Sequence, residues 1–220
     1  MMLQLYGHRF SSYTWKALIA LYANGTEFAF RDVDPSADGS AANNAFVKAA
    51  HPAGKFPILV DGETTIFEAT AIIEYLAARH PGDAPLIPAD AQQAAVTRMM
   101  DRVFDNYVMN VGQLVVNAYI ADAEAPDPAQ VQAGKDGLLR SYAWLEHWLS
   151  SNALPPHVSL VSCAAAPSLF YADWIERIPA ACPRVAALRA ELLALPAVAR
   201  CVDDARAYRR YFPLGAPDRD

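Results

Sequence analysis

Two kinds of hydrophobic pattern divide the chain. In the first 80 residues, four short runs have the length and alternation of β-strands, at residues 3–6, 28–33, 56–60 and 64–67. Apolar positions recur at helical spacing in three further stretches, at residues 15–23, 43–50 and 68–79. Asp61-Gly62, between the last two strand patterns, is a strong hairpin signal. The order of these elements predicts an α/β domain, a mixed four-stranded sheet with helices on both faces.

The pattern changes after residues 81–88, which contain three prolines and read as a linker. Beyond the linker we expect no strand. Helical patterns cover residues 91–121, 135–149, 164–178, 184–195 and 197–208, the first with a bend near Gly112. We therefore expect three parts: a domain at 1–80, a linker at 81–88 and an all-α domain at 89–220.

Composition and charge narrow the functional class. The formal charge is −6 and there is no Lys/Arg run, which argues against a nucleic-acid partner. No apolar stretch approaches the ~20 residues of a membrane span, and the N-terminus lacks a signal-peptide pattern, so we expect a cytoplasmic protein. The three cysteines are too far apart for a zinc site or a CxxC pair, and we expect buried thiols and no metal: Cys163, Cys182 and Cys201.

Candidate chemistry begins at Ser11 and Ser12, which lie between the first strand and the first helix. Unpaired N–H groups and the helix dipole favour negative charge at a helix N-terminus. A hydroxyl there can stabilise an anion, or it can simply cap the helix.

Two other segments could bind a peptide-like ligand. Lys55-Phe56-Pro57 opens the third strand, where a cis bond before Pro57 would leave the Phe56 main chain free to pair, and a trans strand-entry proline is the alternative. Glu68 opens the next helix, whose first N–H groups can hold a carboxylate while the Glu68 side chain holds an ammonium. A solvated glutamate favoured by the helix dipole is the simpler interpretation.

Together, in order and spacing, these segments resemble the cytosolic glutathione S-transferase superfamily, in particular its bacterial, serine-type (theta- and zeta-like) members. The resemblance covers nearly the whole chain. It implies a thioredoxin-like N-terminal domain, an all-α C-terminal domain, and Ser11 as the catalytic hydroxyl. It also implies a homodimer and a second-substrate pocket between the domains, with Tyr13 and Tyr107 in its wall.

The same resemblance assigns the glutathione contacts. Lys55 and the Phe56 main chain would hold the glycyl and cysteinyl parts, Pro57 would follow a cis bond, and Glu68 with Ala69 would hold the γ-glutamyl group. The family usually has Ser where this chain has Ala69, so one hydroxyl contact is absent. Ser159 and Ser162 resemble the family's helix-capping box, with Ser162 in place of Asp.

The predicted activity is a glutathione S-transferase that activates glutathione, its co-substrate, as a thiolate for attack on small apolar electrophiles, a detoxification chemistry. No metal is expected. One alternative is a glutathione-dependent isomerase of the maleylacetoacetate type, although that subfamily favours Cys where this chain has Tyr13. Another is a glutathione-fold binding module without turnover.

Overall fold

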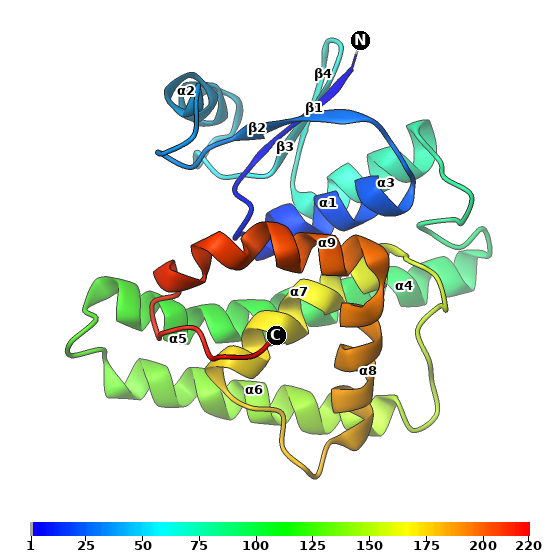
Figure 1. The fold of residues 1–220 in the computed structure, drawn as a ribbon. Helices are drawn as coiled ribbons and strands as arrows, with labels where there is room; N and C mark the ends of the chain where they lie inside the picture. The colour runs from blue at the N-terminus through cyan, green and yellow to red at the C-terminus, as the bar shows by residue number, and fades with distance from the viewer. Residues whose placement is uncertain (1) are drawn as a thin grey trace.

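The computed structural model describes residues 2–220, and Figure 1 shows the chain as a small sheet domain above a bundle of helices. The four strands are β1 (Leu3–Gly7), β2 (Phe28–Asp32), β3 (Ile58–Asp61) and β4 (Thr64–Phe67). Their order is β2-β1-β3-β4, with β1 parallel to β2 and antiparallel to β3, and β3 antiparallel to β4. The mixed four-stranded sheet predicted from the sequence is confirmed.

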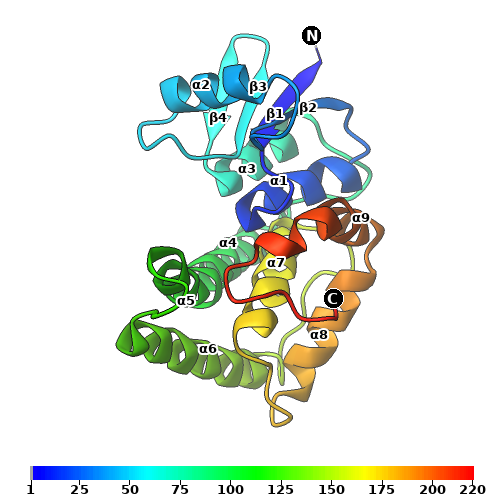
Figure 2. The same ribbon diagram turned by 60° about the vertical axis from the view of Figure 1, so that its left-hand side comes forward.

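Three helices cover the sheet: α1 (Ser12–Ala23), α2 (Ser40–Ala50) and α3 (Ala69–Arg79). Alternate residues along each strand point to opposite faces of the sheet and so belong to different cores. Leu5 and Leu59 belong to the large core beneath α1 and α3. Tyr6 and Ile58 belong to a small separate core under α2, where Tyr6 stacks on Phe46 at 4.3 Å. Figures 1 and 2 both place α1 at the junction between the sheet and the helical bundle.

The helical part contains α4 (Ala91–Val103), η1 (Phe104–Met109), α5 (Asn110–Ala121), α6 (Pro128–Trp148), α7 (Leu160–Ile175), α8 (Pro183–Ala194), α9 (Pro196–Ala205) and η2 (Arg206–Tyr211). Here η1 is a π-helical turn and η2 a 3-10 helix. No strand occurs after the linker within residues 2–220, as predicted. The same residues include no helix that is both long and apolar enough to cross a membrane.

Helix starts are where the sequence predictions were least accurate. α6 begins seven residues before the predicted 135, because Asp127 accepts a hydrogen bond from the Ala129 N–H and Pro128 occupies the first turn. α7 begins at Leu160 because Ser159 and Ser162 form the capping box, with the Ser159 N–H donating to Ser162 Oγ at 3.2 Å. The capping prediction is therefore confirmed. The long first helix is interrupted by η1, ahead of the predicted bend at Gly112.

The α7 helix is the centre of the core, since all sixteen of its residues are buried. Trp15 of α1 packs on Phe170 and Tyr171 of α7 at ring distances of 5.0 and 5.5 Å. One apolar cluster therefore runs from the sheet through α1 into the bundle. This continuity fixes the sheet domain and the helices relative to each other.

A buried charge cluster crosses the same junction. Lys16 of α1 is 1% exposed, and its Nζ donates to Asp101 Oδ1 and Asp105 Oδ2, each at 2.7 Å. It also donates to Thr70 Oγ1 of α3 at 3.0 Å. Arg102, half exposed, closes the cluster from outside with hydrogen bonds to both carboxylates. One buried ammonium thus ties α1 to α3, α4 and η1.

The charged groups of this cluster are removed from water, which costs free energy unless each charge is paired. Burial raises the pKa of the Asp105 carboxyl, and the Lys16 ammonium pulls that pKa the other way. Two cations face two carboxylates, so the cluster is neutral as a whole. Removing the ammonium would leave two buried carboxylates with one cation, Arg102, and breaking a buried ion pair by removing one partner is strongly destabilising.

Lys16→Met should therefore lower the free energy of unfolding by about 3–5 kcal/mol. The matched control is Arg98→Met, because Arg98 makes an exposed ion pair with Glu74 at 2.6 Å and should contribute less than about 1 kcal/mol. Urea denaturation of both variants measures the difference. Equal losses in the two variants would contradict a structural role for the buried cluster.

Candidate active site

The register of the sheet brings the three predicted segments to one end. Tyr6 of β1 pairs with Ile58 of β3, and Ile58 pairs with Phe67 of β4. The last residues of β1 and β4 therefore lie beside the first residue of β3. Three segments therefore meet at this end of the sheet: the loop to Ser11, the Phe56-Pro57 segment and the Glu68 segment.

Ser11 is the N-cap of α1. Its Oγ accepts a hydrogen bond from the Thr14 N–H at 3.3 Å, and its carbonyl accepts from the Trp15 N–H at 2.9 Å. The Thr14 contact uses a lone pair of the hydroxyl and leaves its hydrogen available as a donor. The cap and the donor interpretations of Ser11 are thus compatible in one geometry.

Ser11 and Ser12 open onto a cavity of about 310 Å³. Its walls come from the α1 start, η1, α5, α7 and the C-terminal segment, and include Phe10, Tyr13, Met109, Val116, Tyr171 and Phe212. None of the residues that line it is Lys or Arg. The cavity therefore offers a hydroxyl beside an apolar, partly aromatic surface.

Tyr13 lines this cavity and is held as a hydrogen-bond donor. Its hydroxyl donates to Asn110 Oδ1 at 2.9 Å. Burial, and next the charge of Asp105, raise the pKa of Tyr13 to about 12. The phenol therefore stays protonated at neutral pH and does not act as a base.

Tyr107 does not line the cavity that contains Ser11. It is 60% exposed and lies beside a different cavity, with Val103 and Trp144. Met109 and Val116 line the cavity beside Ser11 instead. The cause is the π-helical turn, in which helical spacing no longer tells which residues face inward.

The Phe56–Pro57 peptide bond is cis, the isomer that the family resemblance implies. Pro57 is buried and Phe56 half-buried, while Lys55 is exposed. Pro57 directly precedes β3, so this segment lies at the start of β3, beside the end of β1. The structure thus brings Phe56 to the same end as Ser11.

Glu68 has a backbone geometry that is rare for a residue with a side chain. Its φ is 69° and its ψ 115°, at the start of α3. Such conformations cost about 1–3 kcal/mol and gather at functional sites. The Glu68 side chain is 73% exposed, with His51 Nε2 at 3.6 Å, and Ala69 behind it is buried. His51 itself is buried, and its Nδ1 accepts from the Ala53 N–H at 3.0 Å.

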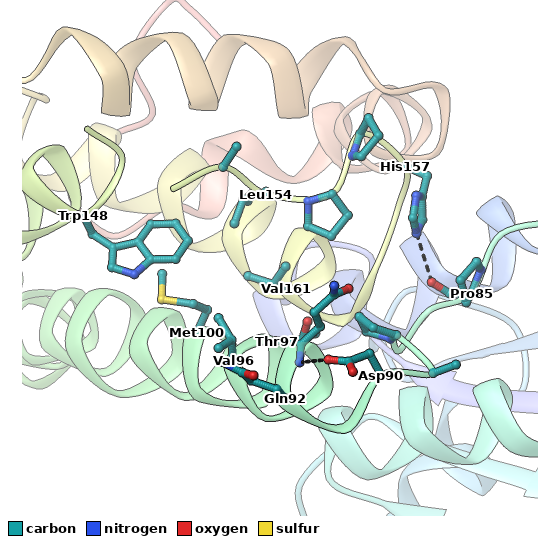
Figure 3. A pocket seen from close by; sticks show the side chains of 16 residues that line it. Pro85, Asp90, Gln92, Val96, Thr97, Met100, Trp148, Leu154, His157 and Val161 are labelled. Atoms are coloured by element: carbon teal, nitrogen blue, oxygen red, sulfur yellow. Dashed lines mark hydrogen bonds between the residues drawn. The ribbon is translucent and has the colours of Figure 1, made fainter. Parts of the chain in front are cut away.

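A larger cavity, of about 900 Å³, lies elsewhere in the helical part. Trp148 and Met100 lie at one end of it, and Pro85 and His157, joined by a hydrogen bond of 3.1 Å, lie at the other (Figure 3). None of the residues predicted to bind glutathione or to act in catalysis lines it. Cavity size alone therefore does not indicate the active site of this protein.

Other reactive groups are enclosed in the core. All three cysteines are free and buried, and burial raises the pKa of Cys163 to about 12. Within residues 2–220, no three His, Cys, Asp or Glu side chains are grouped so as to hold a metal ion. The sequence did not predict the contact of His8 with Asp34 or that of Tyr171 with the Phe10 carbonyl, because these partners are 26 and 161 residues apart.

Comparison with known proteins agrees with this geometry. The family profile described as "Glutathione S-transferase, N-terminal domain" matches residues 1–78. Glutathione S-transferase 1 of Dianthus caryophyllus is 30% identical over 151 residues, which span 69% of this chain and 66% of that protein. A probable maleylacetoacetate isomerase of Vibrio cholerae is 26% identical over 211 residues, 93% of this chain and 97% of that protein.

Solved structures extend the agreement over the whole chain. The structure described as apo glutathione S-transferase III superposes with a TM-score of 0.75 and 25% identity, and covers 99% of this chain and 100% of that chain. Both the sheet domain and the helical bundle are therefore matched in one neighbour. On the profile, the relatives and the fold, the chain belongs to the glutathione S-transferase superfamily.

Proposed function

We propose that the protein is a serine-type glutathione S-transferase, zeta- or theta-like, that activates glutathione as a thiolate for attack on small apolar electrophiles. The observation that carries the proposal is the position of Ser11. Its hydroxyl caps α1, and Ser11 lines an apolar cavity at the end of the sheet where the Phe56 and Glu68 segments also lie.

The Ser11 hydroxyl needs to supply only a modest free energy. A free thiol has a pKa of about 8.5, so only a few per cent is thiolate at neutral pH. Lowering that pKa by about two units requires about 2.7 kcal/mol. One charge-assisted hydrogen bond from Ser11 Oγ and the dipole of α1 are together of this size. A general base is not required.

Peptide contacts would hold glutathione in register with Ser11. The exposed Glu68 carboxylate would bind the γ-glutamyl ammonium, and the Ala69 N–H at the start of α3 would bind the neighbouring carboxylate. The Phe56 main chain would pair with the cysteinyl residue and Lys55 with the glycyl end. Since Ala69 has no hydroxyl, the main chain would carry the second contact alone.

The cavity favours a neutral electrophile over a charged one. Maleylacetoacetate carries two carboxylates, and binding it away from water calls for cationic partners. The cavity beside Ser11 has no Lys or Arg in its lining and has aromatic walls instead. We therefore prefer the transferase over the isomerase. The non-catalytic alternative predicts glutathione binding without turnover.

Glu68→Ala should weaken glutathione binding by about 1.5–3 kcal/mol if Glu68 contacts the ammonium. Glu63→Ala is the matched control, because Glu63 is exposed in the turn between β3 and β4, at the opposite end of the sheet. Calorimetric titration measures both affinities. Absence of heat with wild-type protein at millimolar glutathione would contradict the proposed function.

Ser11→Ala should raise the pKa of the bound thiol and lower turnover about 10- to 1,000-fold, the size expected for the loss of one preorganised donor. Glutathione affinity should change much less, because the peptide contacts remain. Thiolate absorbance against pH, in protein saturated with glutathione, reports the shift. Ser12→Ala is the control, and a shift in that variant alone would move the catalytic role one residue along the chain.

We also propose a homodimer formed through the outer faces of α4, η1 and α6. Large apolar side chains are exposed there, including Val96, Met99, Tyr107 and Trp144. Contiguous exposed apolar residues mark interaction surfaces.

Sedimentation at micromolar concentration should therefore give twice the mass of the chain. Trp144→Glu should shift the equilibrium towards the monomer, because it would place a charge in the apolar contact. A wild-type mass of one chain would refute the dimer.

A further inference from the structure

The loop before Ser11 is organised by His8. Its Nδ1 accepts a hydrogen bond from the Phe10 N–H at 3.0 Å, and its carbonyl accepts from the Ser11 N–H at 3.0 Å. Its Nε2 lies 3.0 Å from Asp34 Oδ2. The ring packs against Tyr208 with centroids 4.8 Å apart. His8 thus contacts both residues that follow Arg9 in this loop.

Asp34 is itself held in place. Its Oδ1 accepts from the Ser36 N–H at 2.7 Å and from the Ser36 hydroxyl, and its own N–H donates to Asp32 Oδ1 at 3.0 Å. The hydrogen bonds from Ser36, and next the one from His8, lower the pKa of Asp34. Asp34 therefore presents an ionised carboxylate to His8 Nε2.

The two ring contacts are chemically complementary. An ionised carboxylate only accepts, so Nε2 carries the hydrogen, and in the neutral imidazole this makes Nδ1 an acceptor. A backbone N–H only donates, and the Phe10 N–H points to Nδ1. This tautomer is assigned from the hydrogen-bond network. Asp34 therefore selects the form of His8 that the loop needs.

Other contacts hold the carbonyls of the loop. The Trp15 indole N–H donates to the Arg9 carbonyl at 2.6 Å, and the Tyr171 hydroxyl donates to the Phe10 carbonyl at 2.9 Å. These two donors come from α1 and α7. The Phe10 N–H has its partner in His8. Without that acceptor, a half-buried N–H directly before Ser11 would have to find another partner by moving the loop.

We propose that His8 is a positioning residue, which Asp34 holds as an acceptor for the Phe10 N–H so that the Ser11 hydroxyl is aimed at the glutathione sulfur. This inference rests on the proposed function in its last step only, since the ordering of the loop does not require glutathione. Both ring nitrogens of His8 are paired with protein groups, so His8 acts through Ser11 and not on the reacting atoms. Its contribution is to fix the donor geometry, which governs how strongly Ser11 stabilises a thiolate.

Two substitutions test the hydrogen-bond acceptor of His8 separately from the packing of its ring. His8→Phe keeps a ring against Tyr208 but has no acceptor. His8→Asn loses the ring and the reach to Asp34, but its side-chain oxygen can accept from the N–H two residues on, as in an Asx-turn. If the acceptor matters, the asparagine variant should behave like wild type and the phenylalanine variant should not.

The first measurement is amide hydrogen exchange at Phe10 without glutathione. We expect exchange about tenfold faster or more in His8→Phe and near wild type in His8→Asn. The second is thiolate absorbance against pH in protein saturated with glutathione. His8→Phe should raise the apparent pKa of the bound thiol by about one unit, with about tenfold lower kcat and an almost unchanged KM for glutathione. Thermal midpoints verify that both variants are folded.

Three outcomes would overturn the proposal: an unchanged thiol titration in His8→Phe, unchanged Phe10 exchange in that variant, or equal impairment in His8→Phe and His8→Asn. A wild-type protein in which the bound thiol titrates at no lower pH than the thiol of free glutathione would instead overturn the proposed function. In that event the exchange rates would still decide whether His8 orders the loop.

Discussion

The burial of α1 is the constraint on which the rest of the structure depends. Its residues 14–21 are all buried, with the sheet on one side and α7 on the other. A helix enclosed in this way cannot shift without disturbing both parts of the molecule. Ser11 is the cap of that helix, so the position of its hydroxyl is fixed by the main core of the protein.

The helical part contributes to the site as well as supporting it. Within the π-helical turn, Asp105 faces the buried ammonium of α1 while Met109 lines the cavity beside Ser11. Tyr171 of α7 also lines that cavity and holds the Phe10 carbonyl. π-Helical turns often occur at functional sites. The same short segments therefore join the two parts of the fold and line the cavity beside Ser11.

Local patterns in the sequence were sufficient to predict the fold and to find the segments that meet at one end of the sheet. These patterns depend only on residues close together in the chain: alternation in the strands, the Asp61-Gly62 turn and the helical repeats. All four strands lie close to their predicted bounds. Ser11, Phe56 and Glu68 were identified because each lies at a junction between a strand and a helix or loop. The start of α6 was missed because Val131 is the only large aliphatic side chain among residues 128–134, so the hydrophobic signal is weak, and the start depends on a cap.

Tertiary structure alone decided which polar side chains meet. His8 and Asp34 are 26 residues apart, and Tyr171 reaches the Phe10 carbonyl across 161. Lys16 resembles a solvated helical lysine in the sequence, yet it is buried between two carboxylates more than 80 residues away. Tyr107 and Met109 belong to the same π-helical turn, yet they lie beside different cavities. The sequence determined where chemistry could lie, because capping and periodicity act locally, whereas orientation depends on how distant elements pack.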